Sequence, residues 1–161
     1  HSAGMHQLKP LMALNNKNIQ PILTNNILSV FLITKAFAKK ANKEKASIVL
    51  ISSTSAIKGN AGTSVYSASK GAVLSATRSL AIELSVRNIR VNSLVPGMVN
   101  TSMTQSFLSS LNDTQKNKII NDHLLGIGEA DDVAHFVLFL LSDKSKWVTG
   151  SELVIDGGLS C

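Results

Sequence analysis

The sequence predicts an α/β fold in which helices cover both faces of a doubly wound parallel sheet. Three observations predict it. Helix-like and strand-like segments alternate along the chain. The strand-like segments, such as "SIVLIS", are apolar runs without polar alternation, which is typical of strands buried on both faces. Polar loops follow these strands, at the edge where ligands bind in such folds, so the sequence predicts a single crevice there.

The first elements can be assigned in order from the apolar pattern. Residues 25–41 carry a broad apolar face and form a long helix. Residues 47–52 are a short β-branched run and form a buried strand. Residues 66–85 form a second long helix. Residues 88–96 form a strand that the following Pro-Gly pair stops.

The second half of the chain continues the alternation. Residues 100–123 are polar and predict short helices. Residues 131–142 form a third long helix, with Asp131 and Asp132 favourably placed in its first turn. Residues 151–156 form a last strand. The 161 residues are enough for one domain with a real core, so we expect a single domain over 1–161.

Composition excludes several classes of protein. The chain is 44% hydrophobic and 16% charged, as soluble globular domains are. A lone cysteine, Cys161, rules out an internal disulfide and indicates a reducing, cytoplasmic compartment. The longest fully apolar run, 136–141, is too short to cross a membrane. The four histidines lack ligand spacing, so we expect no metal site.

The basic charge leaves two interpretations open. The net charge is +6, and its densest cluster contains Lys39, Lys40, Lys43 and Lys45. This cluster is either a docking patch for an acidic partner or a solvated helix end, where lysines suit the negative end of the helix dipole. One Trp and one Tyr give no base-stacking platform, so nucleic acid is not expected as a partner.

The only tyrosine, Tyr66, lies four residues before Lys70, with small residues between them. On a helix this spacing places both side chains on one face. A neighbouring ammonium favours the phenolate, so we expect Lys70 to lower the pKa of Tyr66 toward the range useful for proton transfer. Alone, such a pair is more often a surface contact, and its surroundings decide the interpretation.

Three further segments place polar groups near this pair. Ser53 directly follows the buried strand, where its hydroxyl can donate to a developing oxyanion. Asn26 lies near the start of the preceding helix, where an amide is usually only an N-cap. The segment "PGMVNT" follows the next strand, and its backbone amides and Thr101 can hold a polar ligand.

Together these segments resemble the classical short-chain dehydrogenase/reductase family. "YSASK" is similar to its catalytic Tyr-x-x-x-Lys, Ser53 to its serine, and Asn26 in "NILSVF" to its asparagine. "VNSLVPGMVNT" and "VTGSELVIDGG" are similar to its later segments. The order and spacing agree over essentially the whole chain. The resemblance implies a Rossmann-like doubly wound sheet, of which this chain is the C-terminal part.

The resemblance also implies a role for each residue. Tyr66 would be the general acid and base, Lys70 would lower its pKa and bind the nicotinamide ribose, and Ser53 would steady the substrate oxygen. Asn26 would hold a water in a proton relay. The cofactor, NAD or NADP, would contact Tyr66 and Lys70 and the loop residues Gly4, Pro96, Gly97, Val99 and Thr101. The backbone of Val99 would hold the nicotinamide carboxamide. Asn92 would be structural.

One part of the family's pattern is absent from the sequence. The chain opens at "HSAG", which is similar to the family's Asn-Asn-Ala-Gly after the fourth strand, with His1 and Ser2 in place of asparagines. We therefore expect about 90 residues, including the Gly-rich phosphate turn, to precede it. A truncated chain is one explanation, and a degenerate relative that no longer binds cofactor is the other.

The resemblance implies an oxidoreductase that interconverts a ketone and a secondary alcohol. The sequence looks most like the 3-oxoacyl-carrier-protein reductase type, whose substrate is bound to acyl carrier protein, and Arg87 and the lysine cluster could meet such a carrier. A polyol or sugar dehydrogenase shares the same motifs, and a non-catalytic scaffold is a third alternative. The small residues along 68–79 and the apolar helix 25–41 predict a homo-oligomer, a tetramer in the resembling family.

Overall fold

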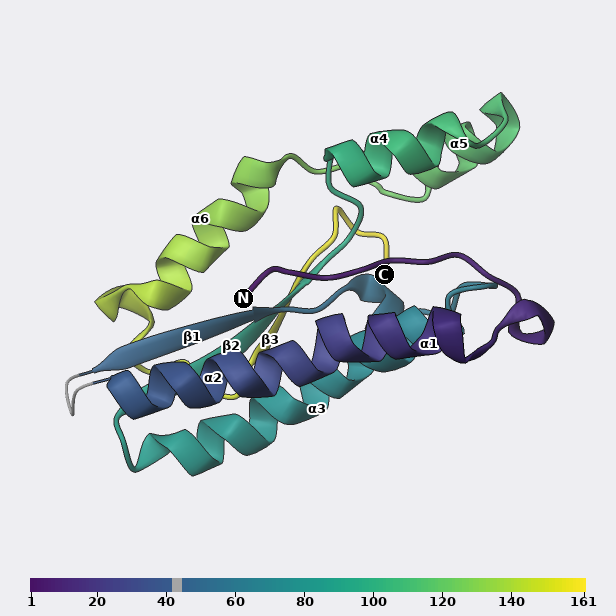
Figure 1. Ribbon diagram of the computed structural model, residues 1–161. Coiled ribbons are helices and arrows are strands. Elements are labelled where there is room, and N and C mark those ends of the chain that lie inside the picture. The colour runs from purple at the N-terminus through teal and green to yellow at the C-terminus, as the bar shows by residue number, and fades with distance from the viewer. Residues whose placement is uncertain (42–44) are drawn as a thin grey trace.

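The structure, a computed structural model, describes residues 1–41 and 45–161. Figure 1 shows the helices and strands alternating as predicted from the first strand onward. The helices are α1 (Asn16–Leu23), the π-helical η2 (Thr24–Leu28), α2 (Ser29–Lys40), α3 (Ser64–Ser85), α4 (Ser102–Ser109), α5 (Asp113–Asn121) and α6 (Ala130–Leu141). The strands are β1 (Ala46–Ile51), β2 (Ile89–Pro96) and β3 (Glu152–Ile155), and short 3-10 turns are η1 (Leu11–Ala13), η3 (Thr54–Ala56) and η4 (Asp143–Ser145).

The three strands form one parallel sheet in the order β1-β2-β3. Residues 46–51 of β1 pair with residues 89–94 of β2, and residues 93–96 of β2 pair with residues 152–155 of β3. Helix α3 connects the first pair of strands, and the segment from α4 to α6 connects the second. The predicted α/β fold with a doubly wound parallel sheet is confirmed.

The sheet has a hydrophobic core on each face. Helices α2 and α3 cover one face, and α6 covers the other (Figure 1). The larger cluster contains Val30, Ala38, Leu50, Val73, Ala76, Leu80, Ala81, Leu84, Ile89 and Val91. The smaller cluster contains Val49, Leu94 and Leu140. The central strand β2 is buried at every residue except Arg90, which is partly buried. The edge strand β3 is less buried, and its Val154 is 48% exposed.

The first helical stretch begins nine residues earlier than predicted. Helix α1 starts at Asn16, where the Asn15 side chain accepts a hydrogen bond from the Asn18 amide. Its first turn is polar and Pro21 lies inside it, so the short apolar set Ile19, Ile22 and Leu23 did not mark it as helix. The chain then widens into π-helical turns at η2 before continuing as α2. Asn26 therefore lies inside a continuous helical stretch rather than at its start.

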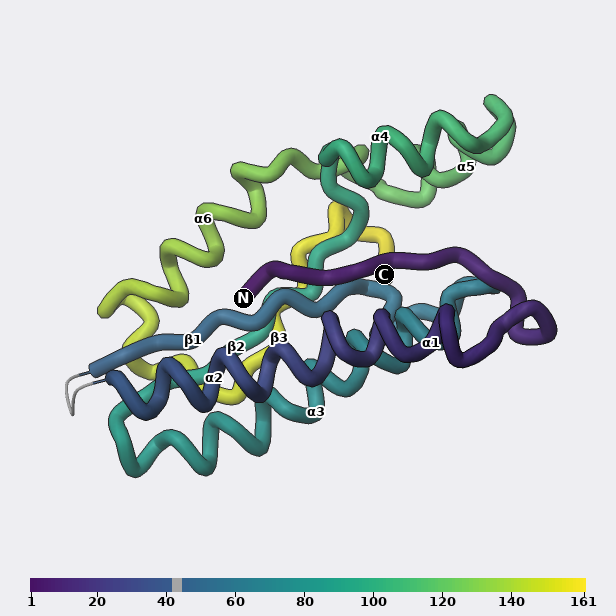
Figure 2. The backbone as a smooth tube through the Cα atoms, in the orientation of Figure 1, coloured from purple at the N-terminus to yellow at the C-terminus, as the bar shows by residue number. Residues whose placement is uncertain are grey.

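The first ten residues run as an extended segment past the end of β1 (Figure 2). The His1 amino group donates to Val49 O at 2.8 Å, and the Ile51 amide donates to His1 O at 3.2 Å. Farther along, the Lys9 amide donates to Gly62 O just before α3. This path carries Gly4 across the edge of the sheet where β1 ends.

Residues 16–40 are long and apolar enough to cross a membrane by length and composition. Core helices of soluble proteins pass the same test. In this fold the stretch packs against α3 through Val30 and Ala38. Of the lysine cluster, Lys39 and Lys40 lie in the last turn of α2 and Lys45 is exposed, while Lys43 lies outside the described residues.

We expect Arg90 to stabilise the end of the sheet opposite the predicted crevice. Its guanidinium donates to three carbonyls, Leu140 O at 2.9 Å, Ser142 O at 3.2 Å and Val148 O at 3.2 Å. Arg90→Met leaves the last carbonyls of α6 without this partner, so the free energy of unfolding should fall by about 1.5–3 kcal/mol in urea denaturation.

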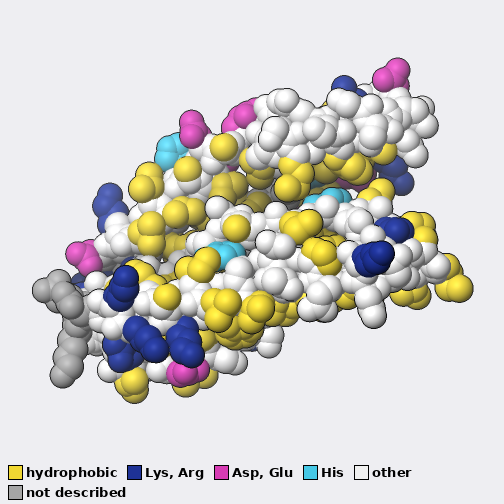
Figure 3. Space-filling model, in the orientation of Figure 1, with side chains coloured by type: hydrophobic (Ala, Val, Ile, Leu, Met, Phe, Trp, Pro, Cys, Tyr) yellow, Lys and Arg dark blue, Asp and Glu magenta, His cyan; other side chains and the backbone are white. Residues whose placement is uncertain are grey.

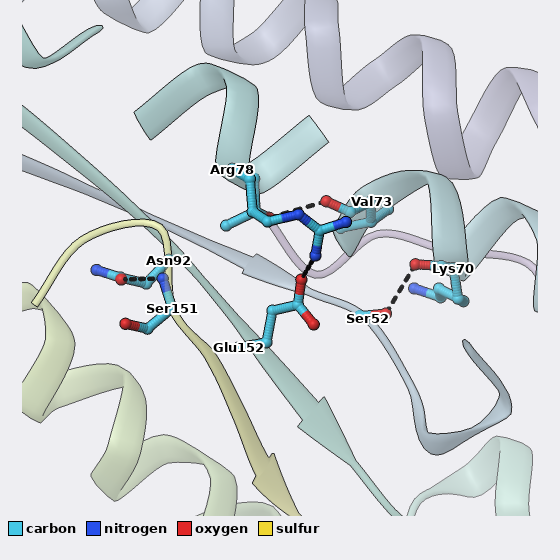
Figure 4. Close-up of polar contacts among 8 residues, drawn as sticks. Ser52, Lys70, Val73, Arg78, Asn92, Ser151 and Glu152 are labelled. Atoms are coloured by element: carbon cyan, nitrogen blue, oxygen red, sulfur yellow. Dashed lines mark hydrogen bonds and ion pairs between the residues drawn. The ribbon is translucent and has the colours of Figure 1, made fainter. Parts of the chain in front are cut away.

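Arg78→Met is the matched control for this prediction. Arg78 forms an ion pair with Glu152, but its side chain is 58% exposed (Figure 4). Exposed ion pairs contribute at most about 1 kcal/mol. Equal losses in the two variants would contradict a special role for Arg90.

Candidate active site

Tyr66 and Lys70 lie one turn apart near the start of α3, and their side chains share a face. The Lys70 ammonium nitrogen is 5.8 Å from the centroid of the Tyr66 ring. Lys70 is only 5% exposed, and its Nζ donates to Ile51 O at 2.9 Å, at the end of β1. The lysine therefore joins α3 to the carboxyl edge of the sheet.

Ser53 lies beside Tyr66, as its place after the strand predicted. It is the N-cap of η3, where its Oγ accepts a hydrogen bond from the Ser55 amide at 3.2 Å. The same hydroxyl hydrogen-bonds the Tyr66 phenol. The structure thus brings the serine, the tyrosine and the lysine together at one edge of the sheet.

The predicted direction of the Tyr66 pKa is wrong. Burial raises the pKa of Tyr66 above its usual value near 10, and the hydrogen bond with Ser53 offsets only part of this increase. Burial also lowers the pKa of Lys70 to about 8. Desolvation therefore outweighs the attraction expected from Lys70, whose ammonium is directed to a backbone carbonyl rather than to the phenol oxygen.

Asn26 is almost fully buried and has three hydrogen bonds. Its Oδ1 accepts from the Met5 amide at 2.7 Å, and its Nδ2 donates to Met5 O and to Ser69 Oγ, each at 2.9 Å. These bonds fasten the N-terminal segment to α3, next to Lys70. Most of the amide is thereby occupied, and the relay water remains a prediction. Asn26 lies in the π-helical turns, which often occur at functional sites.

Gly4 lies directly over this group. A Cβ built there would come within 3.4 Å of both Asn26 Oδ1 and Lys70 Nζ. A side chain at position 4 would therefore cover the ammonium that the predicted site requires to be accessible. The structure supplies this reason for glycine at that position.

The Pro96-Gly97 turn and Thr101 are engaged in structural contacts. The Gly97 amide donates to Ile155 O at 2.9 Å, and a Cβ at Gly97 would come within 2.8 Å of Asp156 Cα. Pro96 is the last, buried residue of β2. Thr101 is exposed and caps α4, where its Oγ1 accepts from the Thr104 amide at 3.2 Å. Cofactor contacts at these positions remain predictions.

Val99 differs from its neighbours because its backbone has an open edge. It forms an isolated parallel bridge with Gly128. The Gly128 amide donates to Met98 O at 3.1 Å, and the Asn100 amide donates to Gly128 O at 2.7 Å. In this pairing the N–H and C=O of Val99 point to the opposite side. Across residues 1–41 and 45–161 neither group has a protein partner, so together they offer a donor and an acceptor to a primary amide.

Comparisons with known proteins agree with this geometry. A family model described as "Enoyl-(Acyl carrier protein) reductase" matches residues 1–160. Cyclopentanol dehydrogenase from Comamonas sp. is 40% identical over 98% of this chain, and the 3-oxoacyl-[acyl-carrier-protein] reductase of Thermotoga maritima is 36% identical over 99%. The chain belongs to the short-chain dehydrogenase/reductase family.

Solved structures of this family have the same fold. A 4-hydroxyisoleucine dehydrogenase complexed with NADH superposes with a TM-score of 0.92 at 31% identity, covering 99% of this chain and 66% of that chain. The chain spans 63–64% of the length of the two curated short-chain dehydrogenase/reductase relatives described above.

Asn92 has the structural role that the resemblance to short-chain dehydrogenases implies. It is fully buried in β2. Its Nδ2 donates to Val148 O at 2.9 Å, and its Oδ1 accepts from the Ser151 amide at 3.1 Å (Figure 4). It therefore fixes the chain that leads into β3.

Sequence analysis missed His6, which borders the Tyr66 ring. The two rings have centroids 4.7 Å apart in an edge-to-face arrangement, and the ring of Phe107 in α4 has its centroid 6.2 Å from that of His6. Burial lowers the pKa of His6 below 6.5, so the ring is neutral at pH 7. A lone histidine without ligand spacing carries no signal. The one sequence feature that could have indicated His6 is its position two residues after Gly4.

The buried charge of Lys70 predicts a pH-dependent stability. Its folded pKa of about 8 lies below the value of 10.5 for an exposed lysine. The unfolded chain therefore binds more protons between these values, and stability attributable to this group rises with pH. Wild-type stability relative to Lys70→Met should increase by about 2 kcal/mol between about pH 8 and pH 10.

Urea denaturation at the two pH values measures this change. Lys17→Met is the control, because Lys17 is exposed on α1. The wild type and Lys17→Met should keep a constant difference across the same range. Tyr66 is present in all three proteins, so its titration contributes equally to their free energies of unfolding and cancels when these are subtracted. A pH-independent difference between the wild type and Lys70→Met would contradict the lowered pKa.

Proposed function

We propose that the protein is an NAD- or NADP-dependent oxidoreductase that interconverts a ketone and a secondary alcohol. The observation that carries the proposal is the convergence of Ser53, Tyr66 and Lys70 at the carboxyl edge of β1. A phenol, a hydroxyl and an ammonium placed together suit proton transfer to a carbonyl oxygen. A purely structural scaffold has no need to bury a lysine beside a tyrosine at this edge.

The open edge of Val99 supports the nicotinamide cofactor. A primary carboxamide accepts one hydrogen bond and donates another, which matches the free N–H and C=O of this residue. Lys70 and Gly4 would lie toward the ribose. The cofactor, when bound, supplies or accepts the hydride. A structural relative is complexed with NADH, which agrees with this assignment.

Tyr66 holds the proton that the carbonyl oxygen receives in the reducing direction. Because burial raises its pKa, the phenol is protonated throughout the neutral range and is ready to donate. The Ser53 hydroxyl hydrogen-bonds that phenol in the resting site, and with substrate bound it would turn its one proton to the same substrate oxygen. In the oxidising direction the phenolate is required, so the rate of alcohol oxidation should rise with pH.

Lys70 acts through its position and charge. With a pKa of about 8 it is mostly protonated at pH 7, and one of its N–H groups is used by Ile51 O. The remaining N–H groups can reach a ribose hydroxyl or a water. A phenolate formed on Tyr66 is stabilised by this ammonium, even though burial dominates in the resting site.

The substrate is proposed as a small ketone or secondary alcohol, free or attached to acyl carrier protein. Cyclopentanol dehydrogenase and 3-oxoacyl-[acyl-carrier-protein] reductase are both relatives at similar identity. The exposed lysines Lys40 and Lys45, which lie outside the groove between α2 and α3, support contact with an acidic carrier. Cyclopentanone and a 3-oxoacyl thioester are therefore the first substrates to compare.

Tyr66→Phe tests the catalytic role of the phenol. In the protein expressed from its complete reading frame, ketone reduction should fall by about 10²- to 10⁴-fold, because general acid catalysis is lost. Cofactor affinity and thermal stability should stay close to the parent values, since Phe fills the same volume. Ketone reduction is followed by the absorbance of NADH or NADPH.

Ser67→Ala is the matched control, because Ser67 lies on the same turn of α3 and its hydroxyl hydrogen-bonds the Thr63 hydroxyl. It should leave the rate within a few-fold of the parent. If Tyr66→Phe also reduces ketone at that level, Tyr66 is not the acid and the scaffold alternative is favoured.

We also propose that the protein forms a homo-oligomer, a tetramer, through α2 and α3. Large apolar side chains are exposed on both helices: Phe31, Leu32, Ile33, Phe37, Ile82 and Val86. Figure 3 shows hydrophobic side chains on the surface over α2. A groove of about 400 Å³ runs between the two helices, lined by Phe31, Leu80 and Leu84 among others. Exposed apolar surface of this extent is typical of an interface.

Light scattering at micromolar concentration tests the assembly. Phe31→Lys should shift the protein to a smaller species, because a charge placed at the centre of the apolar face must be desolvated on association. Trp147→Lys is the control, since Trp147 is 96% exposed and lies outside this face. A monomeric parent protein would overturn the proposal.

A further inference from the structure

His123 has an unusual position for a histidine outside the catalytic group. It follows α5 and is only 5% exposed, whereas His1 and His6 are half-buried and His135 is exposed. Both of its ring nitrogens are occupied. Nδ1 lies 2.8 Å from Ile119 O, and the Met98 amide donates to Nε2 at 3.1 Å.

These two contacts require one form of the ring. A carbonyl can only accept, so Nδ1 must carry the proton. An amide N–H can only donate, so Nε2 must be unprotonated. The ring is therefore neutral, with its proton on Nδ1, and it bridges two backbone segments that are 21 residues apart.

One of these segments carries the open edge of Val99. The Gly97 amide and the Met98 carbonyl are held by Ile155 O and the Gly128 amide. The peptide unit between Gly97 and Met98 is held on its N–H side by His123. This peptide immediately precedes the free N–H of Val99. A change in its tilt redirects the donor and acceptor that suit the nicotinamide carboxamide.

The other segment is the end of α5. Ile119 belongs to the last turns of that helix. Helices α4 and α5 form the connection that leaves the Met98–Thr101 loop, and Phe107 of α4 reaches His6 beside Tyr66. His123 therefore ties the end of α5 to the Met98–Thr101 loop. Helix α4 follows this loop and contacts His6, which lies beside Tyr66.

We propose that His123 is a positioning residue that couples the α4–α5 segment to the cofactor-binding edge of Val99. The proposal rests on the function proposed above. The hydrogen bond to Met98 fixes the orientation of the Val99 N–H and C=O. The hydrogen bond to Ile119 makes that orientation depend on the position of α4 and α5. Disrupting the Met98 bond should weaken nicotinamide and ketone binding more than it slows the chemical step.

Two substitutions separate the two bonds of the ring. In His123→Gln the side-chain Oε1 reaches the place of Nε2 and can still accept from Met98. In His123→Asn the Nδ2 reaches the place of Nδ1 and can still donate to Ile119 O, but Met98 loses its acceptor. His135→Asn, at an exposed position of α6, is the control for the change of residue type.

The first measurement needs no cofactor. Amide hydrogen exchange at Met98 should accelerate about tenfold in His123→Asn and stay near the parent rate in His123→Gln, because one net hydrogen bond is worth about 1.4 kcal/mol. In the parent, ¹⁵N shifts of the ring should show the proton on Nδ1. A proton on Nε2, or equal exchange in both variants, overturns the proposal even if a variant folds poorly.

The second measurement uses the protein expressed from its complete reading frame. The KM values for NADH or NADPH and for ketone should rise about tenfold in His123→Asn, with a smaller change in kcat, and His123→Gln should restore both to within a few-fold. Equal KM values in the two variants overturn the coupling. A parent protein without cofactor binding contradicts the proposed function instead, while the exchange experiment still decides whether His123 holds the loop.

Discussion

The contact between α3 and the end of β1 positions the rest of the candidate site. It includes two hydrogen bonds in opposite directions. Lys70 Nζ donates to Ile51 O at 2.9 Å. Ser52 Oγ donates to Lys70 O at 2.8 Å, as Figure 4 shows. Because Ser53 follows Ser52 and Tyr66 lies one turn before Lys70, the two bonds place serine and tyrosine side by side. The same anchor supports the Asn26 contacts through Ser69, which is next to Lys70.

This anchor has an energetic cost that a structural contact alone does not require. A neutral side chain could fill the space of Lys70 without desolvating a charge. The lowered pKa of Lys70 shows that burial disfavours its ammonium form. Burying the charge of Lys70 therefore lowers the stability of the fold at the position where the proposed chemistry needs a cation. Such a conflict between stability and function is common.

The fold could be predicted from the sequence because its signals are local and strong. Apolar runs marked β1 and β2, and the spacing of Tyr66 and Lys70 placed both on one face of α3. The start of α1 was missed because its apolar set, Ile19, Ile22 and Leu23, is short and interrupted by Pro21. That helix is held by tertiary packing, which composition does not reveal.

The electrostatics of the site could not be predicted from spacing alone. The expectation for Tyr66 considered only the nearby charge of Lys70, but the sign of the shift depends on how much water the fold removes from the phenol. Likewise, the residue types in "PGMVNT" do not distinguish Val99 from Gly97 and Met98, and only the family resemblance singled out its backbone. Only the pairing with Gly128, the carbonyl of Ile155 and the ring of His123 determine which amide is left open.

Helix α3 links the site to the proposed oligomer interface. One side of it carries Lys70 and Val73 toward the sheet, and another side lines the groove with α2 through Leu80 and Leu84, while Ile82 is 77% exposed. A partner packed there would restrict movement of the helix that carries the tyrosine and the lysine. Assembly and catalysis would then depend on the same rigid element, which accounts for an apolar face on a helix whose other face is committed to polar chemistry.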